Sequence, residues 1–182
     1  NQPVSASLQR RLLDRELRQP LETSLIAEDG VSVAGLVQAV QDVLQSSSPL
    51  VPVLQPHAPR LLALVGGLTL HPVAQLLLTA AQTARPAHYA HAVAAMALNG
   101  ALMAADGGDD AAVRLALMSG LLHDVGEMYI DPLHGEAEAD RDLDFASYQQ
   151  LVVHPHVGYL LVAQLTNYPA EGARALAAHH AR

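Results

Sequence analysis

Cysteine, lysine and tryptophan are absent from this chain of 182 residues. Without cysteine the protein forms neither disulfide bonds nor thiolate zinc sites. The ten Lys and Arg positions are all arginine, so every mechanism that needs a lysine amine is excluded. Aromatic residues make up 3% of the chain, although hydrophobic residues make up 51%. The core must therefore be built from Leu, Val and Ala at close range, which favours an all-α fold.

Basic residues are also few: 10 Lys and Arg positions against 18 Asp and Glu give a formal net charge of −8. A surface that binds DNA, RNA or an anionic membrane needs many cations, so none of these partners is expected. A small phosphorylated substrate is still compatible with this charge, since bound metal ions can neutralise its phosphate. The longest apolar run, residues 61–70, is far shorter than the ~20 residues of a membrane-spanning helix. The N-terminus has no apolar core of the signal-peptide type, and we expect a cytoplasmic protein.

Apolar residues recur at helical spacing along most of the chain, and prolines lie between many of these helical segments. The predicted helices cover residues 7–19, 32–45, 60–70, 72–84, 86–105, 111–123, 145–153, 155–165 and 169–180. Residues 49–59 contain four prolines, which a helix interior does not tolerate, so this stretch is predicted to be a linker. The acidic stretch 131–144 is predicted to be a surface loop. The expected fold is an all-α helical bundle.

The ten histidines are distributed unevenly, and most of them follow residue 87. The candidate metal ligands are His91, the pair His123-Asp124, His154, and the pair His179-His180. Imidazole nitrogens combined with carboxylate oxygens suit divalent ions such as iron, manganese or zinc. Neighbours on a regular helix point in different directions, so His123 and Asp124 can face one site only where a helix ends. Gly126 is predicted to end that helix, and Asp110 is predicted to cap its beginning.

The other histidines are interpreted as ordinary hydrogen-bonded structural residues, because a single imidazole on an apolar helix is more often structural than a ligand. They are His57, His71, His88, His134 and His156. The acidic residues between positions 136 and 144 lack the glycine and the final glutamate of a calcium loop, so a solvated loop is the simpler interpretation.

Three elements of the sequence resemble the HD phosphohydrolase superfamily, and its HD-GYP branch in particular. Residues 121–126, LLHDVG, are similar to the LLHD(I/V)G signature of the superfamily. Residues 154–158, HPHVG, resemble the HPxxG element of HD-GYP proteins, and residues 179–180 stand where that family has its HHE segment. The resemblance identifies residues 84–182 as an HD-GYP-like metal-binding domain. Residues 1–83 are expected to form an N-terminal helical extension.

The resemblance implies that six side chains surround a metal centre of two or three divalent ions, with Asp124 as the bridging and catalytic ligand. These side chains are His91, His123, Asp124, His154, His179 and His180. Iron or manganese is expected, and zinc is an alternative. In the family a hydroxide between the ions attacks the phosphorus of a phosphodiester, and cyclic di-GMP is the substrate that the family implies. Arg182 is the expected substrate-binding residue, with Arg174 as the other nearby cation.

Three departures from the family pattern support an alternative function. Glu127 stands where the family has a lysine close to the substrate phosphate, and Ala181 replaces the glutamate of the HHE segment. The sequence ends at Arg182, before the GYP-containing loop, so the domain is expected to be truncated at its C-terminal end. The alternative is a non-catalytic signalling module, similar to HDOD and degenerate HD-GYP domains, that binds a nucleotide or a partner protein. A homodimer is compatible with either function.

Overall fold

The computed structural model describes residues 3–14, 18–130 and 145–180. Its helices are α1 (Ala6–Leu13), α2 (Val33–Gln45), α3 (Val51–Leu54), α4 (Ala58–Gly66), α5 (Pro72–Ala84), α6 (Pro86–Ala105), α7 (Asp110–Leu122), α8 (Phe145–Leu151), α9 (His154–Leu165) and α10 (Ala170–Ala178). Three short 3-10 helices are η1 (Leu21–Ser24), η2 (Gln55–His57) and η3 (Val125–Tyr129). These described ranges contain no strand, which confirms the predicted all-α fold. The predicted loop 131–144 lies outside them.

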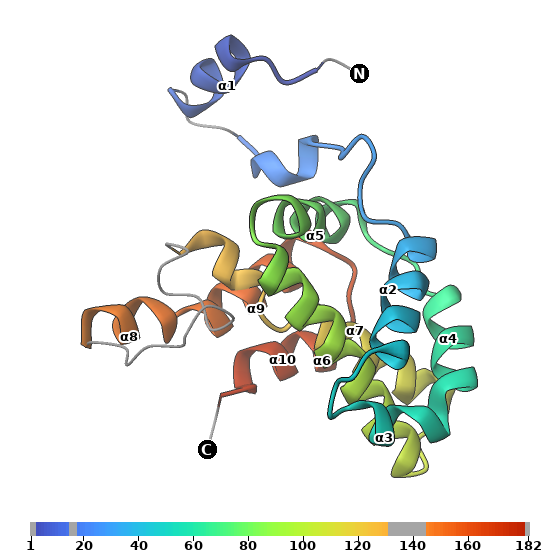
Figure 1. The fold of residues 1–182 in the computed structure, drawn as a ribbon. Helices are drawn as coiled ribbons and strands as arrows, with labels where there is room; N and C mark the ends of the chain where they lie inside the picture. The colour runs from blue at the N-terminus through green and yellow to red at the C-terminus, as the bar shows by residue number, and fades with distance from the viewer. Residues whose placement is uncertain (1–2, 15–17, 131–144, 181–182) are drawn as a thin grey trace.

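The helical hairpin of α6 and α7 forms the centre of the molecule, with α2 and α4 on one side and α9 and α10 on the other (Figure 1). The two helices of the hairpin approach closely because small residues line their contact. At Gly120 an added Cβ would lie 2.6 Å from the carbonyl oxygen of Ala95. This is the close helix packing that a core poor in aromatic residues requires. None of the helices in the described ranges is long and apolar enough to cross a membrane.

A single core cluster joins residues from both sides of the predicted domain boundary. It includes Leu36 of α2 and Leu61 of α4, which pack in the same cluster as Met96 of α6 and Leu176 of α10. All four side chains are essentially inaccessible to solvent. The described part of residues 1–83 therefore supports the helices that carry the candidate ligands. The division of the chain at residue 83 stays a prediction.

Residues 49–59 are folded, so their prediction as a linker is wrong. They form α3, η2 and the beginning of α4, and Leu54 is 0% exposed. Pro52, Pro56 and Pro59 each lie in the first turn of one of these elements. A proline is tolerated there because the first amides of a helix have no carbonyl partner within it. The prolines therefore begin three consecutive helical turns and do not break one helix.

Three predicted helix ends also differ from the structure. Asp109, and not Asp110, caps α7, since its carboxylate accepts a hydrogen bond from the backbone amide three residues later at 2.8 Å. Gly126 does not end α7, because the helix ends at Leu122 and Gly126 lies within η3. Helix α1 ends well before residue 19. The second difference bears on the site, because α7 delivers its ligands at the residues that follow Leu122.

Candidate metal centre

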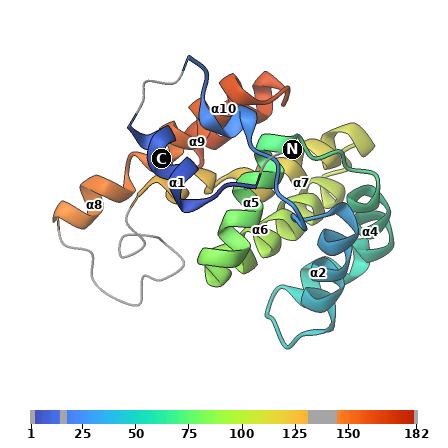
Figure 2. The ribbon, with the colours of Figure 1, turned by 90° about the horizontal axis from the view of Figure 1, so that it is seen from above.

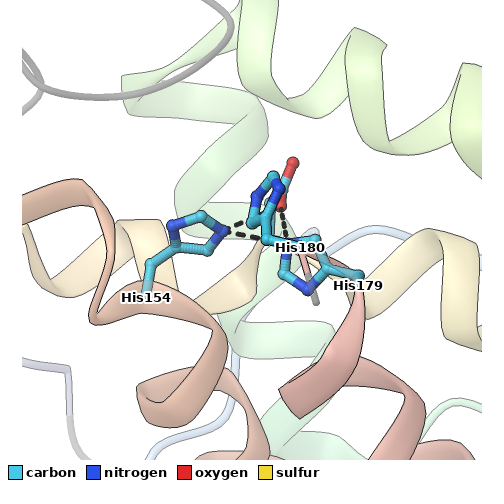
Figure 3. Close-up of side chains that lie close together, drawn as sticks. His154, His179 and His180 are labelled. Carbon is cyan, nitrogen blue, oxygen red and sulfur yellow. Dashed lines mark hydrogen bonds and ion pairs between the residues drawn. The ribbon is translucent and has the colours of Figure 1, made fainter. Parts of the chain in front are cut away.

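Five imidazoles and one carboxylate, drawn from four parts of the chain, converge beside the end of the central hairpin. They are His91 in α6, His123 and Asp124 just after α7, His154 at the first residue of α9, and His179 and His180 just after α10. Figure 3 shows His154, His179 and His180 gathered together, with the first ring coming from α9 and the other two from the end of α10. The structure thus brings together the six residues predicted as ligands. Arg182 lies outside the described residues.

The carboxylate of Asp124 is at the centre of this cluster and its side chain is 1% exposed. Its Oδ2 lies 3.3 Å from Nε2 of His91 and 2.7 Å from Nε2 of His123. Its Oδ1 lies 3.3 Å from Nε2 of His154 and 3.2 Å from Nε2 of His179. Each carboxylate oxygen therefore faces its own pair of imidazoles, which is the arrangement that a carboxylate bridging two cations requires.

Backbone carbonyl groups fix the orientation of three of these rings. The Nδ1 atoms of His123, His154 and His179 lie 2.6–2.8 Å from the carbonyl oxygen of the residue three positions earlier. A carbonyl oxygen cannot donate, so each Nδ1 carries a proton and donates it. In the neutral ring, Nε2 then presents a lone pair to the centre of the cluster. This arrangement arises because each histidine follows the last turn of a helix, where carbonyl groups have no partner within the helix.

The lone pairs at the centre face one another without protons between them in the neutral rings. Nε2 of His91 lies 3.2 Å from Nε2 of His123, and Nε2 of His154 lies 3.0 Å from Nε2 of His179. While these rings are neutral, no group in the described part of the chain donates a hydrogen bond to either buried oxygen of Asp124. Burial of unsatisfied acceptors is costly, so the cluster needs either extra protons or cations.

The donor atoms fall into overlapping groups in which all atoms lie within 4.8 Å of one another. One group is Asp124 with His154, His179 and His180, and another is Asp124 with His91 and His123. His180 is exposed, and its ring centroid lies 4.1 Å from that of His179. Nitrogen and carboxylate donors without sulfur suit borderline or hard divalent metals. These groups could therefore hold metal ions, and Asp124 belongs to both.

A third group lies deeper and contains two residues that sequence reasoning placed elsewhere. His88 and Glu127 are both buried, and Nδ1 of His88 lies 3.1 Å from Oε2 of Glu127. Together with Asp124 they also form a group that could hold a metal ion. Glu127 was expected at the position of a lysine that contacts substrate phosphate, but the structure buries it against His88. Helical spacing could have indicated both residues, because His88 precedes the predicted ligand His91 by one turn and Glu127 follows Asp124 by one turn.

The pKa values of two members of the cluster, Asp124 and His154, are shifted in opposite directions. Burial raises the pKa of Asp124, but hydrogen bonding to His123, His154, His179 and His91 outweighs it and holds the pKa well below its usual range. Burial lowers the pKa of His154, but Asp124 and a backbone carbonyl outweigh it and raise that pKa above its ordinary value. The carboxylate is therefore ionised, and in the absence of a cation the raised pKa favours a proton on His154.

A close contact between Gly126 and the first turn of α9 allows the ligands that follow α7 to meet His154. An added Cβ at Gly126 would lie 2.0 Å from the carbonyl oxygen of His154 and 2.7 Å from the amide nitrogen of Gly158. Conversely, a Cβ at Gly158 would lie 3.4 Å from the amide nitrogen of Gly126. The glycine of LLHDVG thus packs against the backbone of HPHVG. The contact brings the Asp124 carboxylate to the His154 ring, and it is why position 126 must be glycine.

Alanine at position 126 is therefore expected to separate η3 from α9. We expect Gly126→Ala to lower the free energy of unfolding by about 2–3 kcal/mol, the usual cost of overpacking a rigid contact. It should also reduce metal content, because His154 moves away from Asp124. Urea denaturation and elemental analysis measure the two effects. Gly66→Ala is the matched control, because a Cβ there meets nothing closer than 3.8 Å, and it should be neutral or slightly stabilising.

Arg85 is a buried positioning residue that sequence reasoning missed. Its guanidinium donates to the backbone carbonyl oxygen of Glu127 at 2.7 Å and to that of Ile130. These bonds tie the middle and the C-terminal end of η3 to the junction between α5 and α6. The segment that follows Asp124 is thereby fixed on one side by Arg85 and on the other by the glycine contact with α9. No local sequence pattern signals this role, since both partners are backbone atoms more than forty residues away.

A cavity of about 610 Å³ opens beside the centre, between α6, α7 and α10. His123 and His179 form part of its lining, so it adjoins both groups of donor atoms that share Asp124. Ser119 also lines it, and the hydroxyl groups of Ser119 and Tyr168 lie 3.0 Å apart. Burial raises the pKa of Tyr168 to about 12, although Ser119 lowers it. Glu127 does not line this cavity.

In comparisons with known proteins, the chain matches no protein-family model, no curated protein and no solved structure. The resemblance to HD-GYP proteins therefore stays a prediction that rests on the three sequence elements. What is established independently of any family is an all-helical fold with buried histidine and carboxylate groups that could hold metal ions.

Proposed function

We propose that this protein is a metal-dependent phosphohydrolase of the HD type. The observation that carries the proposal is the placement of four imidazole Nε2 atoms around the two oxygens of one buried carboxylate, at 2.7–3.3 Å. Nitrogen and oxygen donors without thiolate favour iron or manganese, with zinc as the alternative. The HD-like motifs that contribute most of these residues point to phosphate esters as the substrate.

The chain's own residues would prepare the site in three ways. Asp124, held ionised by its imidazole neighbours, offers one oxygen to each donor group. The carbonyl groups that accept from Nδ1 of His123, His154 and His179 keep the Nε2 lone pairs directed inward. The cavity lined by His123 and His179 gives the organic part of a substrate a place beside the donors. Bound divalent ions would supply an ionised water nucleophile and stabilise charge on the phosphoryl oxygens.

The test is to purify the protein without chelators, measure metal by elemental analysis, and reload it with iron or manganese. Hydrolysis is then assayed with p-nitrophenyl phosphate, bis(p-nitrophenyl) phosphate and cyclic di-GMP, the last being the substrate that the resemblance predicts. We expect at least one metal per chain and metal-dependent turnover of a phosphoester. Fully loaded protein that hydrolyses none of these compounds would remove the enzyme assignment, and protein that takes up no metal would remove the metal centre as well.

A second candidate function, a non-catalytic signalling module, is favoured by a separate feature. Helix α8 and the residues after it expose large apolar side chains, namely Phe145 at 74%, Tyr148 at 55%, Val152 at 52% and Val153 at 45%. This helix projects from the body on the side away from α2 and α4 (Figure 2). Clustered exposed apolar groups are typical of protein-interaction surfaces. Calorimetry with cyclic di-GMP distinguishes these functions: a nucleotide receptor binds it and leaves it intact, whereas no nucleotide binding favours a protein-interaction role.

A further inference from the structure

The cavity beside the metal centre has a layer of neutral polar groups close to the donor atoms. Ser119 lies one turn before His123 on α7, and both residues line the cavity. Asn99 of α6 also lines it and lies at the same level of the hairpin, because its Nδ2 would be 2.7 Å from a Cβ added at Gly120. A ligand whose phosphate is held at the His123 end therefore meets a hydroxyl group and an amide group first.

One turn further from the centre the walls are apolar. They include Leu115 of α7, and Leu102 and Met103 of α6. The two carboxylates of the lining, Asp106 and Glu171, are exposed to solvent. The apolar walls favour a hydrocarbon group in this part of the cavity. The volume of about 610 Å³ is ample for a small organic molecule.

The hydroxyl group of Ser119 is held in one orientation by Tyr168, which lies between α9 and α10. Tyr168 donates its hydroxyl proton to the backbone carbonyl oxygen of Leu115 at 2.9 Å. A hydroxyl group has one proton, so Ser119 must be the donor in its 3.0 Å hydrogen bond with Tyr168. With its own proton committed in this way, Oγ of Ser119 presents lone pairs to a ligand in the cavity.

Two further features keep this relay in place. Burial raises the pKa of Tyr168 to about 12, although Ser119 lowers it, so the phenol keeps the proton that it donates to Leu115 near neutral pH. The Tyr168 ring is also packed against Gly172 of α10, where an added Cβ would lie 2.7 Å from the phenol oxygen. The acceptor character of Ser119 is therefore built into the fold around the cavity.

We propose that the cavity selects a phosphate ester whose organic part carries a hydrogen-bond donor, a hydroxyl or an amide N–H, close to the phosphate and an apolar body beyond it. Oγ of Ser119 accepts from this donor. Asn99 completes the polar layer, since an amide group both donates and accepts. Tyr168 is a positioning residue, because it acts on the substrate through Ser119. This inference rests on the proposed phosphohydrolase function and gives that function a substrate class.

The test uses two non-hydrolysable phosphonates that differ in one group. 3-hydroxyoctylphosphonate carries a hydrogen-bond donor, whereas 3-oxooctylphosphonate carries only an acceptor at the same carbon, roughly 5 Å from the phosphorus and so about one helical turn away. Each is titrated calorimetrically into manganese-loaded protein. We expect the hydroxy compound to bind about fivefold more tightly, which is the ordinary net effect of one neutral hydrogen bond.

Two variants should remove this difference from opposite sides. Ser119→Ala should weaken the hydroxy compound about fivefold and leave the oxo compound unchanged, because the acceptor is lost. Tyr168→Phe frees the Ser119 proton, so it should strengthen the oxo compound about fivefold and leave the hydroxy compound unchanged. A purely structural role of Tyr168 would not produce this gain. Equal binding of the two compounds by the parent protein, or a Tyr168→Phe variant that weakens both, would overturn the inference.

Ser47→Ala and Tyr148→Phe are the matched controls, because both side chains are exposed and lie outside the cavity lining. Both should keep the difference between the two phosphonates, and loss of the difference in either would contradict the role of the cavity. All four variants should keep the metal content of the parent protein, since none of the changed residues belongs to a donor group.

The apolar body is tested with 3-hydroxybutylphosphonate, which lacks four methylene groups. We expect it to bind at least about tenfold more weakly than the octyl compound, because less apolar surface is removed from water. Equal affinity would place the hydrocarbon body outside the cavity and would overturn that part of the inference. Failure of the protein to take up manganese would instead overturn the proposed function on which the inference rests.

Discussion

Substitution of Asp124 by asparagine is expected to remove metal from the protein and leave its fold intact. The carboxylate is shared by both donor groups, so its loss weakens both metal positions at once. Loss of an outer-shell partner already costs about 10–100-fold in metal affinity, and loss of a charged bridging ligand should cost considerably more. We expect metal content after gel filtration to fall close to zero and any phosphohydrolase activity to fall at least about a thousandfold.

The metal-free variant should be about as stable as the metal-free parent protein. An asparagine amide has the same shape as the carboxylate, and its NH₂ group can donate to the imidazole lone pairs that surround it. Above the raised pKa of His154, where the imidazoles of the metal-free parent are neutral, replacement of the ionised buried group by a neutral donor should therefore change the free energy of unfolding by about 1 kcal/mol or less. Circular dichroism and urea denaturation measure this. An unfolded variant would leave its metal loss uninformative, so Asp124→Glu, which keeps the charge but lengthens the side chain, is measured in parallel.

His156→Ala is the control for a nonspecific effect of histidine loss. His156 is exposed and lies two residues after His154, but it belongs to none of the donor groups. Its removal should leave metal content unchanged. Retention of stoichiometric metal by Asp124→Asn would contradict the central role of this carboxylate and would show that the imidazoles alone hold the ion.

The helices and the candidate ligands were predictable because both depend on local patterns. The apolar spacing of α5, α6 and α7 gave their positions to within one or two residues. The convergence of His91, His123, Asp124 and His154 was predicted through a resemblance of short motifs, and the structure brings these residues together. The sequence around a single histidine does not show whether it is a ligand, because an imidazole that binds metal and one that packs in a core can have the same neighbours in sequence.

The misassigned segments depend on contacts that the local sequence does not contain. Four prolines in eleven residues suggest a linker, yet a proline is acceptable whenever it falls in a first helical turn, and its register is set by packing around Leu54. Gly126 resembled a helix end, but the reason for its glycine is the backbone of His154, distant in sequence. Such close approaches between remote segments become visible only in three dimensions.

The burial of Glu127 could not be predicted for the same reason. A carboxylate at a family lysine position suggests a changed substrate contact, whereas the structure pairs it with His88 one helix away. The cavity beside the centre was also beyond sequence reasoning, because its lining comes from α6, α7 and α10. Motif resemblance identified the donor atoms, but the character of the adjoining surface depends on residues outside every motif.

Metal should reverse the pH dependence of stability, and this is the second large effect that we expect. In the metal-free protein the pKa of His154 lies above its ordinary 6.5, so its stabilising contribution is complete below about pH 6.5 and is lost as pH rises through the raised value. The pKa of Asp124 is lowered, so its contribution is complete above the ordinary 3.8 and is lost only in stronger acid. Metal-free protein should therefore be most stable between about pH 4 and 6.5.

Metal requires the same imidazoles to be neutral, so its affinity should increase over the pH range in which metal-free protein loses stability. With free manganese about a thousandfold above its dissociation constant at pH 8, binding adds about 4 kcal/mol. For a chain of this size that corresponds to a rise in Tm of roughly 10 °C. Thermal unfolding from pH 5 to 8.5, with manganese or with EDTA, should give two curves that diverge with increasing pH. In Asp124→Asn the curves should coincide, whereas in His156→Ala they should diverge as in the parent protein; parallel curves in the parent would mean that metal does not replace protons in this cluster.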